Sequence, residues 1–115
     1  MSDTRGEGRL PAHLEVAGLI RQAQAEGGFA AVLHKGERDA GTILVSLTER
    51  GRPAGLYERM PQLDGSRSWS LTRSQDEDAP QDYADYLSRR AAQDGDLWII
   101  ELDIAHGERL IGLTE

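Results

Sequence analysis

The chain is short and acidic, with 115 residues, a net charge of −7 and no cysteine. Its length suits a single domain, which we expect over residues 10–115, after a flexible polar tail at residues 1–9. The absence of cysteine excludes disulfides, thiolate nucleophiles and cysteine-ligated zinc or iron–sulfur sites. No stretch approaches the roughly 20 apolar residues needed to cross a bilayer, so we expect a cytoplasmic protein without membrane contact.

The acidic residues are concentrated at the carboxyl end. Residues 1–41 carry 6 acidic and 5 basic side chains, residues 42–73 carry 3 and 5, and residues 74–115 carry 11 and 3, which gives −1, +2 and −8. This balance repels phosphate backbones, so nucleic-acid binding is not expected. The arginines of the middle third are expected to pair with the acidic third: Arg50, Arg52, Arg59, Arg67 and Arg73.

Two predicted elements open the domain. Leu10 to Glu26 has apolar residues at helical spacings of three and four and is followed by Gly27-Gly28. This pattern predicts an amphipathic helix that lies across one face of a sheet. Gly28 to Thr48 then has two apolar, β-branched runs around a polar turn, which predicts an antiparallel β-hairpin.

The middle of the chain continues with two strands and a helix. Strands are expected from Ala54 to Gln62 and through Trp69 and Leu71, and they would complete a four-stranded meander. Pro80 begins a second helix, whose apolar stripe contains tyrosines and a leucine, and Gly95 ends it.

Asp96 to Ile104 is the most apolar run and is typical of a central strand, inserted parallel to a neighbour by the preceding helical crossover. Arg109 to Leu113 is expected to add a short last strand. The predicted fold class is therefore α+β, with an antiparallel or mixed sheet of about five strands and two helices in the order α-β-β-β-β-α-β. Both sheet faces are apolar, so either both helices cover them or one helix layer and a partner subunit do so.

Several segments resemble a known family. They are Leu10 to Val16, the run from Gly27 to Gly41, Glu58-Arg59-Met60-Pro61 and Trp98. Together they resemble a bacterial family catalogued as domain of unknown function 1491, and the resemblance extends over nearly the whole chain. It implies a small free-standing bacterial protein and brings no activity, ligand or catalytic residue with it.

The best candidate site is the turn of the predicted hairpin with the strand region near it. Its six side chains are His34, Lys35, Arg38, Asp39, Glu58 and Arg59. A histidine and a carboxylate on one sheet face, rimmed by cations, can hold an anion or transfer protons at neutral pH. Glu58 is expected two strands from His34, about 10 Å away, so that a substrate or a water would lie between them. The simpler interpretation is a solvated turn, in which Asp39 bonds to the local backbone.

Metal and cofactor sites are not expected. His13, His34 and His106 lie in separate predicted elements without the spacing of metal ligands. Gly27-Gly28 precedes a strand, whereas phosphate-binding and dinucleotide-binding loops precede a helix. The carboxylates around Pro80 lack the spacing of an EF-hand and are typical of a helix start.

Two functions of different class fit these patterns. The first is a non-catalytic cytoplasmic binding or protein-interaction module, which binds a protein partner or associates with itself as a homodimer, because the sheet is apolar on both sides and catalytic motifs are lacking. The second is a small enzyme or ligand-binding protein that holds an anionic metabolite with the 34–39 turn and Glu58. Of these, the enzyme is less favoured.

Overall fold

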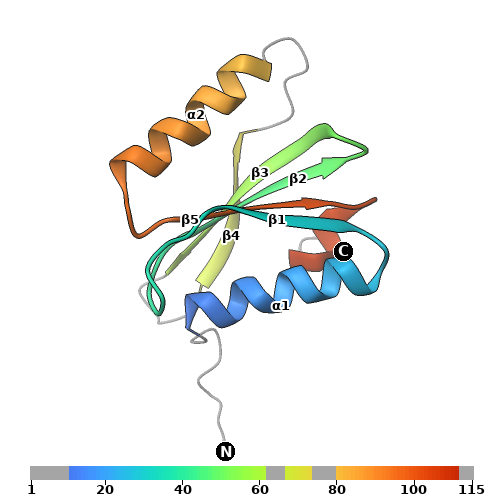
Figure 1. Ribbon diagram of the computed structural model, residues 1–115, viewed down its shortest axis with the longest axis horizontal. Coiled ribbons are helices and arrows are strands. Elements are labelled where there is room, and N and C mark those ends of the chain that lie inside the picture. Colours follow the sequence, from blue (N-terminus) through green and yellow to red (C-terminus); the bar gives the residue numbers. More distant parts are fainter. Residues whose placement is uncertain (1–10, 62–66, 74–79, 112–115) are drawn as a thin grey trace, which may run out of the picture.

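The computed structural model describes residues 11–61, 67–73 and 80–111 (Figure 1). It confirms the predicted α+β class, with the described elements in the order α-β-β-β-β-α-β. The expected tail at residues 1–9, the connection between the third and fourth predicted strands at residues 62–66 and the carboxylates before Pro80 lie outside the described residues. The bounds are α1 Ala12–Ala25, β1 Phe29–His34, β2 Ile43–Glu49, β3 Arg52–Pro61, β4 Arg67–Arg73, α2 Pro80–Gln93, β5 Trp98–Asp103 and the 3₁₀ helix η1 Gly107–Ile111.

The strands form one mixed sheet in the order β1-β5-β2-β3-β4. β5 lies between β1 and β2, antiparallel to the first and parallel to the second, so the prediction of a central parallel strand is confirmed. The predicted hairpin of β1 and β2 is wrong, and of the expected meander only β2, β3 and β4 are consecutive neighbours. The physical reason is the apolar run of β5, which is buried on both faces and needs a strand on each side.

Each face of the sheet is covered by a helix of the chain itself (Figure 1). On one face, Val45 and Ile100 are buried in a cluster with Val16 and Ala23 of α1. Of the two arrangements expected for the apolar faces, the structure therefore has the first, in which both helices of the chain cover them. On the other face, the predicted stripe of α2 packs against the buried residues Leu44, Leu56, Leu97 and Ile99 through Tyr83, Tyr86, Leu87 and Ala91.

The layer that contains α1 differs from the prediction in two details. Leu14 belongs to the apolar spacings that predict the helix of residues 10–26, but it is 48 % exposed, whereas Ala12 and Val16 are buried. The segment expected to begin a last strand at Arg109 lies in η1, where Leu110 and Ile111 are buried. A run of so few apolar residues does not distinguish a strand from a turn of helix. No helix of the described residues is long and apolar enough to cross a membrane.

Candidate functional site

His34 ends β1 and is turned inward. Its Nδ1 lies 2.6 Å from the carbonyl oxygen of Leu97, at the start of β5. Because a carbonyl oxygen only accepts hydrogen bonds, Nδ1 carries the proton and donates it. The histidine therefore joins the end of β1 to the chain entering β5, while Lys35, the next residue, is exposed.

The segment 35–42, which follows β1, is organised by a residue that the sequence did not single out. The Oε1 of Glu37 accepts hydrogen bonds from the backbone N–H groups of Ala40 at 2.6 Å and Asp39 at 2.9 Å. These two donors hold the pKa of the Glu37 carboxyl below its ordinary value. Its carbonyl oxygen accepts a hydrogen bond from Nε1 of Trp98 at 2.7 Å. Glu37 thus closes the turn on itself and onto β5.

Arg38 and Asp39 support α1 through their backbones. The carbonyl oxygen of Asp39 accepts from the N–H of Ala12, and that of Arg38 accepts from the N–H of His13, each at 2.9 Å. Both donors belong to the first turn of α1, whose N–H groups have no partner within a helix. The Arg38 and Asp39 side chains are 74 % and 67 % exposed, with 3.9 Å between Nε and Oδ1. The turn therefore holds the start of α1, and its charged groups remain in solvent.

Glu58 and Arg59 lie on opposite faces of β3. Glu58 is on the α2 side, where its carboxylate is bound by Arg90. It belongs to the same row across the sheet as His34, through Leu44 and Ile99. Because β5 is inserted, three strand spacings separate the two residues, roughly 14 Å, against the two spacings expected. The six predicted site residues are thus distributed over two faces and a turn.

Arg59 lies on the α1 side in a second polar cluster. Its Nη2 is 2.9 Å from Oε2 of Glu15 in α1, and both side chains are largely buried. The guanidinium also lies over the ring of Trp69 in β4, 5.4 Å from the ring centroid. These residues border a groove of about 440 Å³ between α1, η1 and the strands β3 and β4.

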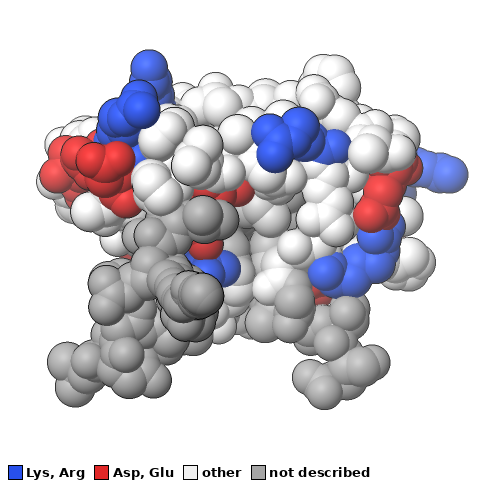
Figure 2. All heavy atoms as spheres, turned by 90° about the horizontal axis from the view of Figure 1, so that it is seen from below, with Lys and Arg blue, Asp and Glu red and all other residues white. Residues whose placement is uncertain are grey.

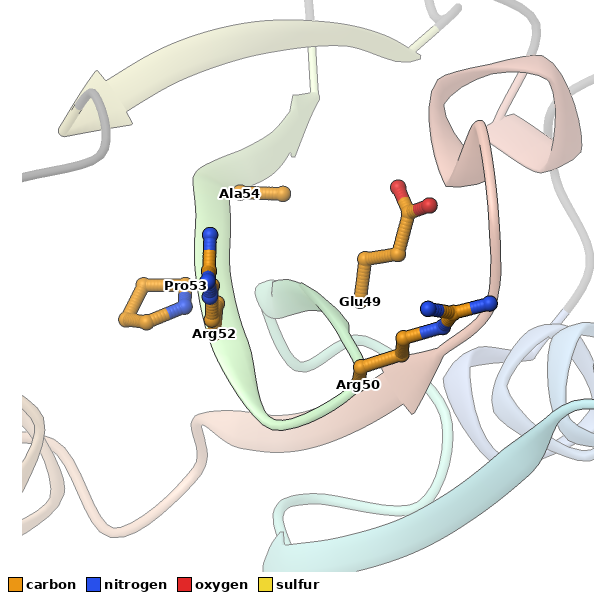
Figure 3. Close-up of a pocket in the computed structure, with 5 residues that line it drawn as sticks. All are labelled: Glu49, Arg50, Arg52, Pro53 and Ala54. Carbon is orange, nitrogen blue, oxygen red and sulfur yellow. The ribbon is translucent and has the colours of Figure 1, made fainter.

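A separate hollow of about 510 Å³ lies at the turn between β2 and β3 (Figure 3). Its lining includes Glu49, Arg50 and Arg52. In Figure 3 the side chain of Arg50 extends from the turn toward the chain that follows β5, and that of Glu49 points into the hollow. An adjoining hollow of about 340 Å³ shares these two residues and reaches Arg109, which is paired with Glu26. Charged groups of both signs therefore gather at this end of the sheet.

The turn that carries Arg50 is held by Asp103, the last residue of β5. The Asp103 carboxylate accepts the backbone N–H groups of Arg50 and Gly51, each at 2.8 Å. Burial raises the pKa of this carboxyl, but the two N–H donors and the hydroxyl of Thr48 outweigh burial and hold the pKa below its ordinary value. Arg50 has a φ of +56°, a conformation that is uncommon for an arginine.

β1 forms one outer edge of the sheet. Phe29 is 72 % exposed, Leu33 49 % and Val32 46 %. Leu33 falls at a register shift, since Val32 pairs with Ile100 and His34 with Ile99 of β5. Large apolar side chains are therefore grouped along an edge strand, which is unusual for a protein that functions alone.

Charged side chains on the α1 side form several separate groups, and in most of them basic and acidic residues are neighbours (Figure 2). Over the described part of this face they do not merge into one basic stripe. Within residues 11–61, 67–73 and 80–111, no three His, Asp or Glu side chains come together in a way that could hold a metal ion.

The fold and these contacts define a small α+β protein with two helices on a five-stranded mixed sheet, in which the segment 35–42 connects α1 to β5. The chain belongs to the family described as protein of unknown function DUF1491, whose profile matches residues 10–112. No curated protein matches the chain.

Solved structures of similar proteins support the same fold. The crystal structure of a DUF1491 family protein from Caulobacter crescentus is 33 % identical, with a TM-score of 0.75, over 90 % of this chain and 95 % of the other. The solution structure of protein Atu0922 from A. tumefaciens is also 33 % identical, with a TM-score of 0.76, over 93 % of this chain and 96 % of the other.

Proposed function

We propose that the protein is a non-catalytic interaction module that associates with a second copy of itself through the β1 edge. The observation that carries this proposal is the exposure of Phe29, Val32 and Leu33 on an outer strand. Soluble proteins commonly protect edge strands with lysine, proline or inward-pointing charge. The β1 sequence Phe-Ala-Ala-Val-Leu-His contains neither lysine nor proline nor an acidic residue, so the edge is suited to pairing with another strand.

The β1 sequence is also complementary to itself. If two copies pair antiparallel with Ala31 at the two-fold axis, Phe29 of each copy lies opposite Leu33 of the other, and Ala30 lies opposite Val32. Phe29 and Leu33 then meet at both ends of the interface, with the alanines and Val32 between them, and both copies use the same patch, as a two-fold interface requires. The same register brings Lys35, which follows β1, toward Glu26, which precedes β1 and is paired with Arg109 of its own copy.

The self-association can be tested by light scattering after size-exclusion chromatography, at micromolar protein. We expect a dimer for the wild type and a monomer for Phe29→Lys and Leu33→Lys, because a charge on the edge opposes strand pairing. Both positions are exposed, so the fold should tolerate the lysine. The matched control is Leu71→Lys on the opposite edge strand β4, where Leu71 is 54 % exposed, and it should remain a dimer. A wild-type protein that stays monomeric, or a Leu71→Lys variant that dissociates equally, overturns the proposal.

The two residues predicted to transfer protons, His34 and Glu58, support a binding function without catalysis. The Nδ1 proton of His34 is directed to the Leu97 carbonyl oxygen, and the Glu58 carboxylate is bound by Arg90, so both groups have structural partners. A cytoplasmic location and a bacterial origin are part of the same proposal. The lack of cysteine supports the first, and the similarity to the proteins from Caulobacter crescentus and A. tumefaciens supports the second.

A small anionic ligand is the alternative, and one observation favours it at a place other than the predicted turn. Arg50 and Arg52 both line the hollow between β2 and β3. Thermal-shift measurements with phosphate, nucleotides and carboxylates would test it, because a ligand that binds the native state raises the melting temperature. A shift lost in Arg50→Asn places the ligand in this hollow, and a shift lost in Lys35→Ala or Arg38→Ala places it at the 34–39 turn. If none of these compounds raises the melting temperature, the ligand-binding alternative is ruled out.

A further inference from the structure

The groove on the α1 side has the size and lining of a small-molecule site. Its volume of about 440 Å³ is within the range that ligand pockets show. Leu14 and Leu19 form its α1 wall, Leu110 and Ile111 lie in η1, and Trp69 lies on β4. None of these residues belongs to the β1 edge, so the groove is independent of the proposed self-association.

Gly18 opens the α1 wall of the groove. It lies in the interior of the helix, and a Cβ added there would meet nothing within 4 Å. A glycine inside a helix lowers its stability relative to alanine, and neither packing nor backbone geometry requires it here. What the glycine provides is clearance, because a flat group can approach the helix backbone at this point.

Among the described residues that line the groove, the two charged side chains have opposite signs and are paired with each other. Arg59 and Glu15 line it together, and they form an ion pair of 2.9 Å with most of each side chain buried. A charged ligand would lose hydration on entering without meeting a net opposite charge. The groove therefore favours an uncharged ligand, and Gln22, which also lines it, offers an amide for one hydrogen bond.

From these observations we infer that the groove between α1, η1 and β4 binds an uncharged, planar aromatic small molecule. In the proposed complex the ring occupies the slot above the Gly18 backbone and contacts the Trp69 side chain, one face of which carries the Arg59 guanidinium. The apolar residues of α1 and η1 exclude water from the ring edges, and the Gln22 amide binds a polar substituent at the rim.

The inference is tested by titrating the ¹⁵N-labelled full chain with indole as a probe and following amide and indole N–H resonances. The expected shifts are at Gly18, Leu110 and the Trp69 indole. The Trp98 indole is an internal control, because Trp98 is buried and its Nε1 donates to Glu37. Benzoate and benzylamine, which have the ring but carry a charge, should bind at least ten-fold more weakly.

Substitutions in α1 provide the matched variants. Gly18→Leu should weaken indole binding at least ten-fold by filling the slot, while Gly18→Ala should raise the melting temperature and still reduce binding. Gln24→Leu, an exposed position of the same helix away from the groove, should bind indole like the wild type. The inference is overturned if Gly18→Leu binds indole like the wild type or if the charged rings bind as tightly as indole. It is also overturned if indole causes no resonance shift, or if the shifts are centred on Phe29. Phe29→Lys, which tests the self-association, should not alter indole binding.

Discussion

Arg90 of α2 and Glu58 of β3 form a two-point ion pair across the interface between helix and sheet. Nη1 donates to Oε1 at 3.2 Å, and Nη2 donates to Oε2 at 3.0 Å. The side chains are only 22 % and 14 % exposed, and Nη1 of Arg90 also donates to the hydroxyl of Tyr86 at 2.8 Å. The hydrogen bond to Glu58 is the main reason that the pKa of Arg90 is raised. The pair fixes α2 over β3, two strands away from the β5 strand that follows it in the chain.

Replacing Glu58 with alanine should lower the free energy of unfolding by about 2 kcal/mol, because a largely buried guanidinium loses its counter-charge. Urea unfolding measures this loss, and the Glu58→Ala/Arg90→Ala double variant should lose less than the sum of the single variants. Arg89→Ala is the control, with an expected change under about 0.5 kcal/mol, since Arg89 is exposed and lies 6.0 Å from the Tyr86 ring centroid. Strictly additive losses would show that the two charges are not coupled.

In the turn between β2 and β3, substitutions at two neighbouring positions should change the free energy of unfolding in opposite directions. Glu49 pairs with Arg52, so Arg50 and Gly51 are the two central residues, with φ values of +56° and +82°. Hairpin turns of this kind favour asparagine followed by glycine. Arg50→Asn should therefore raise the free energy of unfolding by about 0.5 kcal/mol, and Gly51→Ala should lower it by about 1 kcal/mol. A Cβ at Gly51 meets nothing within 4 Å, so the loss would come from the backbone. Denaturant midpoints that move in the opposite directions would contradict this account.

How much the sequence predicts can be judged from β5 and Glu37. The apolar run of β5 identifies a central strand, because only a strand covered on both faces is so continuously apolar. The pattern does not reveal which strands it separates, since pairing between distant segments leaves no local trace. Glu37 has no signal in composition or periodicity, because its role depends on backbone N–H groups two and three residues ahead.

The candidate site was harder to predict than the fold. The distance between His34 and Glu58 depends on the strand order, so one inserted strand changed it. Arg59 was grouped with the candidate site because it follows Glu58 in the sequence. Side chains alternate along β3, however, so Arg59 lies on the other face of the sheet from Glu58. The groove that it lines depends on α1 and η1, which are far apart in the chain.

Asp103 should make stability fall at acid pH. Its pKa in the folded protein is lower than the ordinary value of 3.8, so the unfolded chain binds a proton more readily than the folded one. The contribution is therefore complete above pH 3.8 and is lost as the pH falls through the lower, folded value. Asp103→Asn should remove this contribution and cost about 1 kcal/mol at neutral pH.

The measurement is the free energy of unfolding of the wild type and Asp103→Asn between pH 7 and pH 2.5. The difference between the two proteins should shrink as the pH falls. A difference that stays constant over this range would show that the ionised carboxylate is not what holds the turn. Glu37 also has a lowered pKa, and because it remains in the variant, its effect cancels in the comparison.

Gly41 is, with Gly36, one of two glycines of the segment 35–42 that leave no room for a side chain. A Cβ there would lie 2.2 Å from the backbone oxygen of Asp96 and 3.1 Å from Cδ1 of Trp98. Because the nearest atom is backbone at the entry to β5, relief requires moving the central strand. Gly41→Ala should lower the free energy of unfolding by more than about 3 kcal/mol.

Gly95 supplies the matched control for Gly41→Ala, because an added Cβ there meets nothing within 4 Å. Gly95→Ala should stay within about 0.5 kcal/mol of the wild type. The two variants are compared by urea unfolding monitored by circular dichroism, and loss of any cooperative transition in Gly41→Ala counts as the expected result. If Gly41→Ala unfolds like Gly95→Ala, the segment is not packed tightly against β5. In that case, packing against β5 would not be what positions the segment for its hydrogen bonds to the first turn of α1.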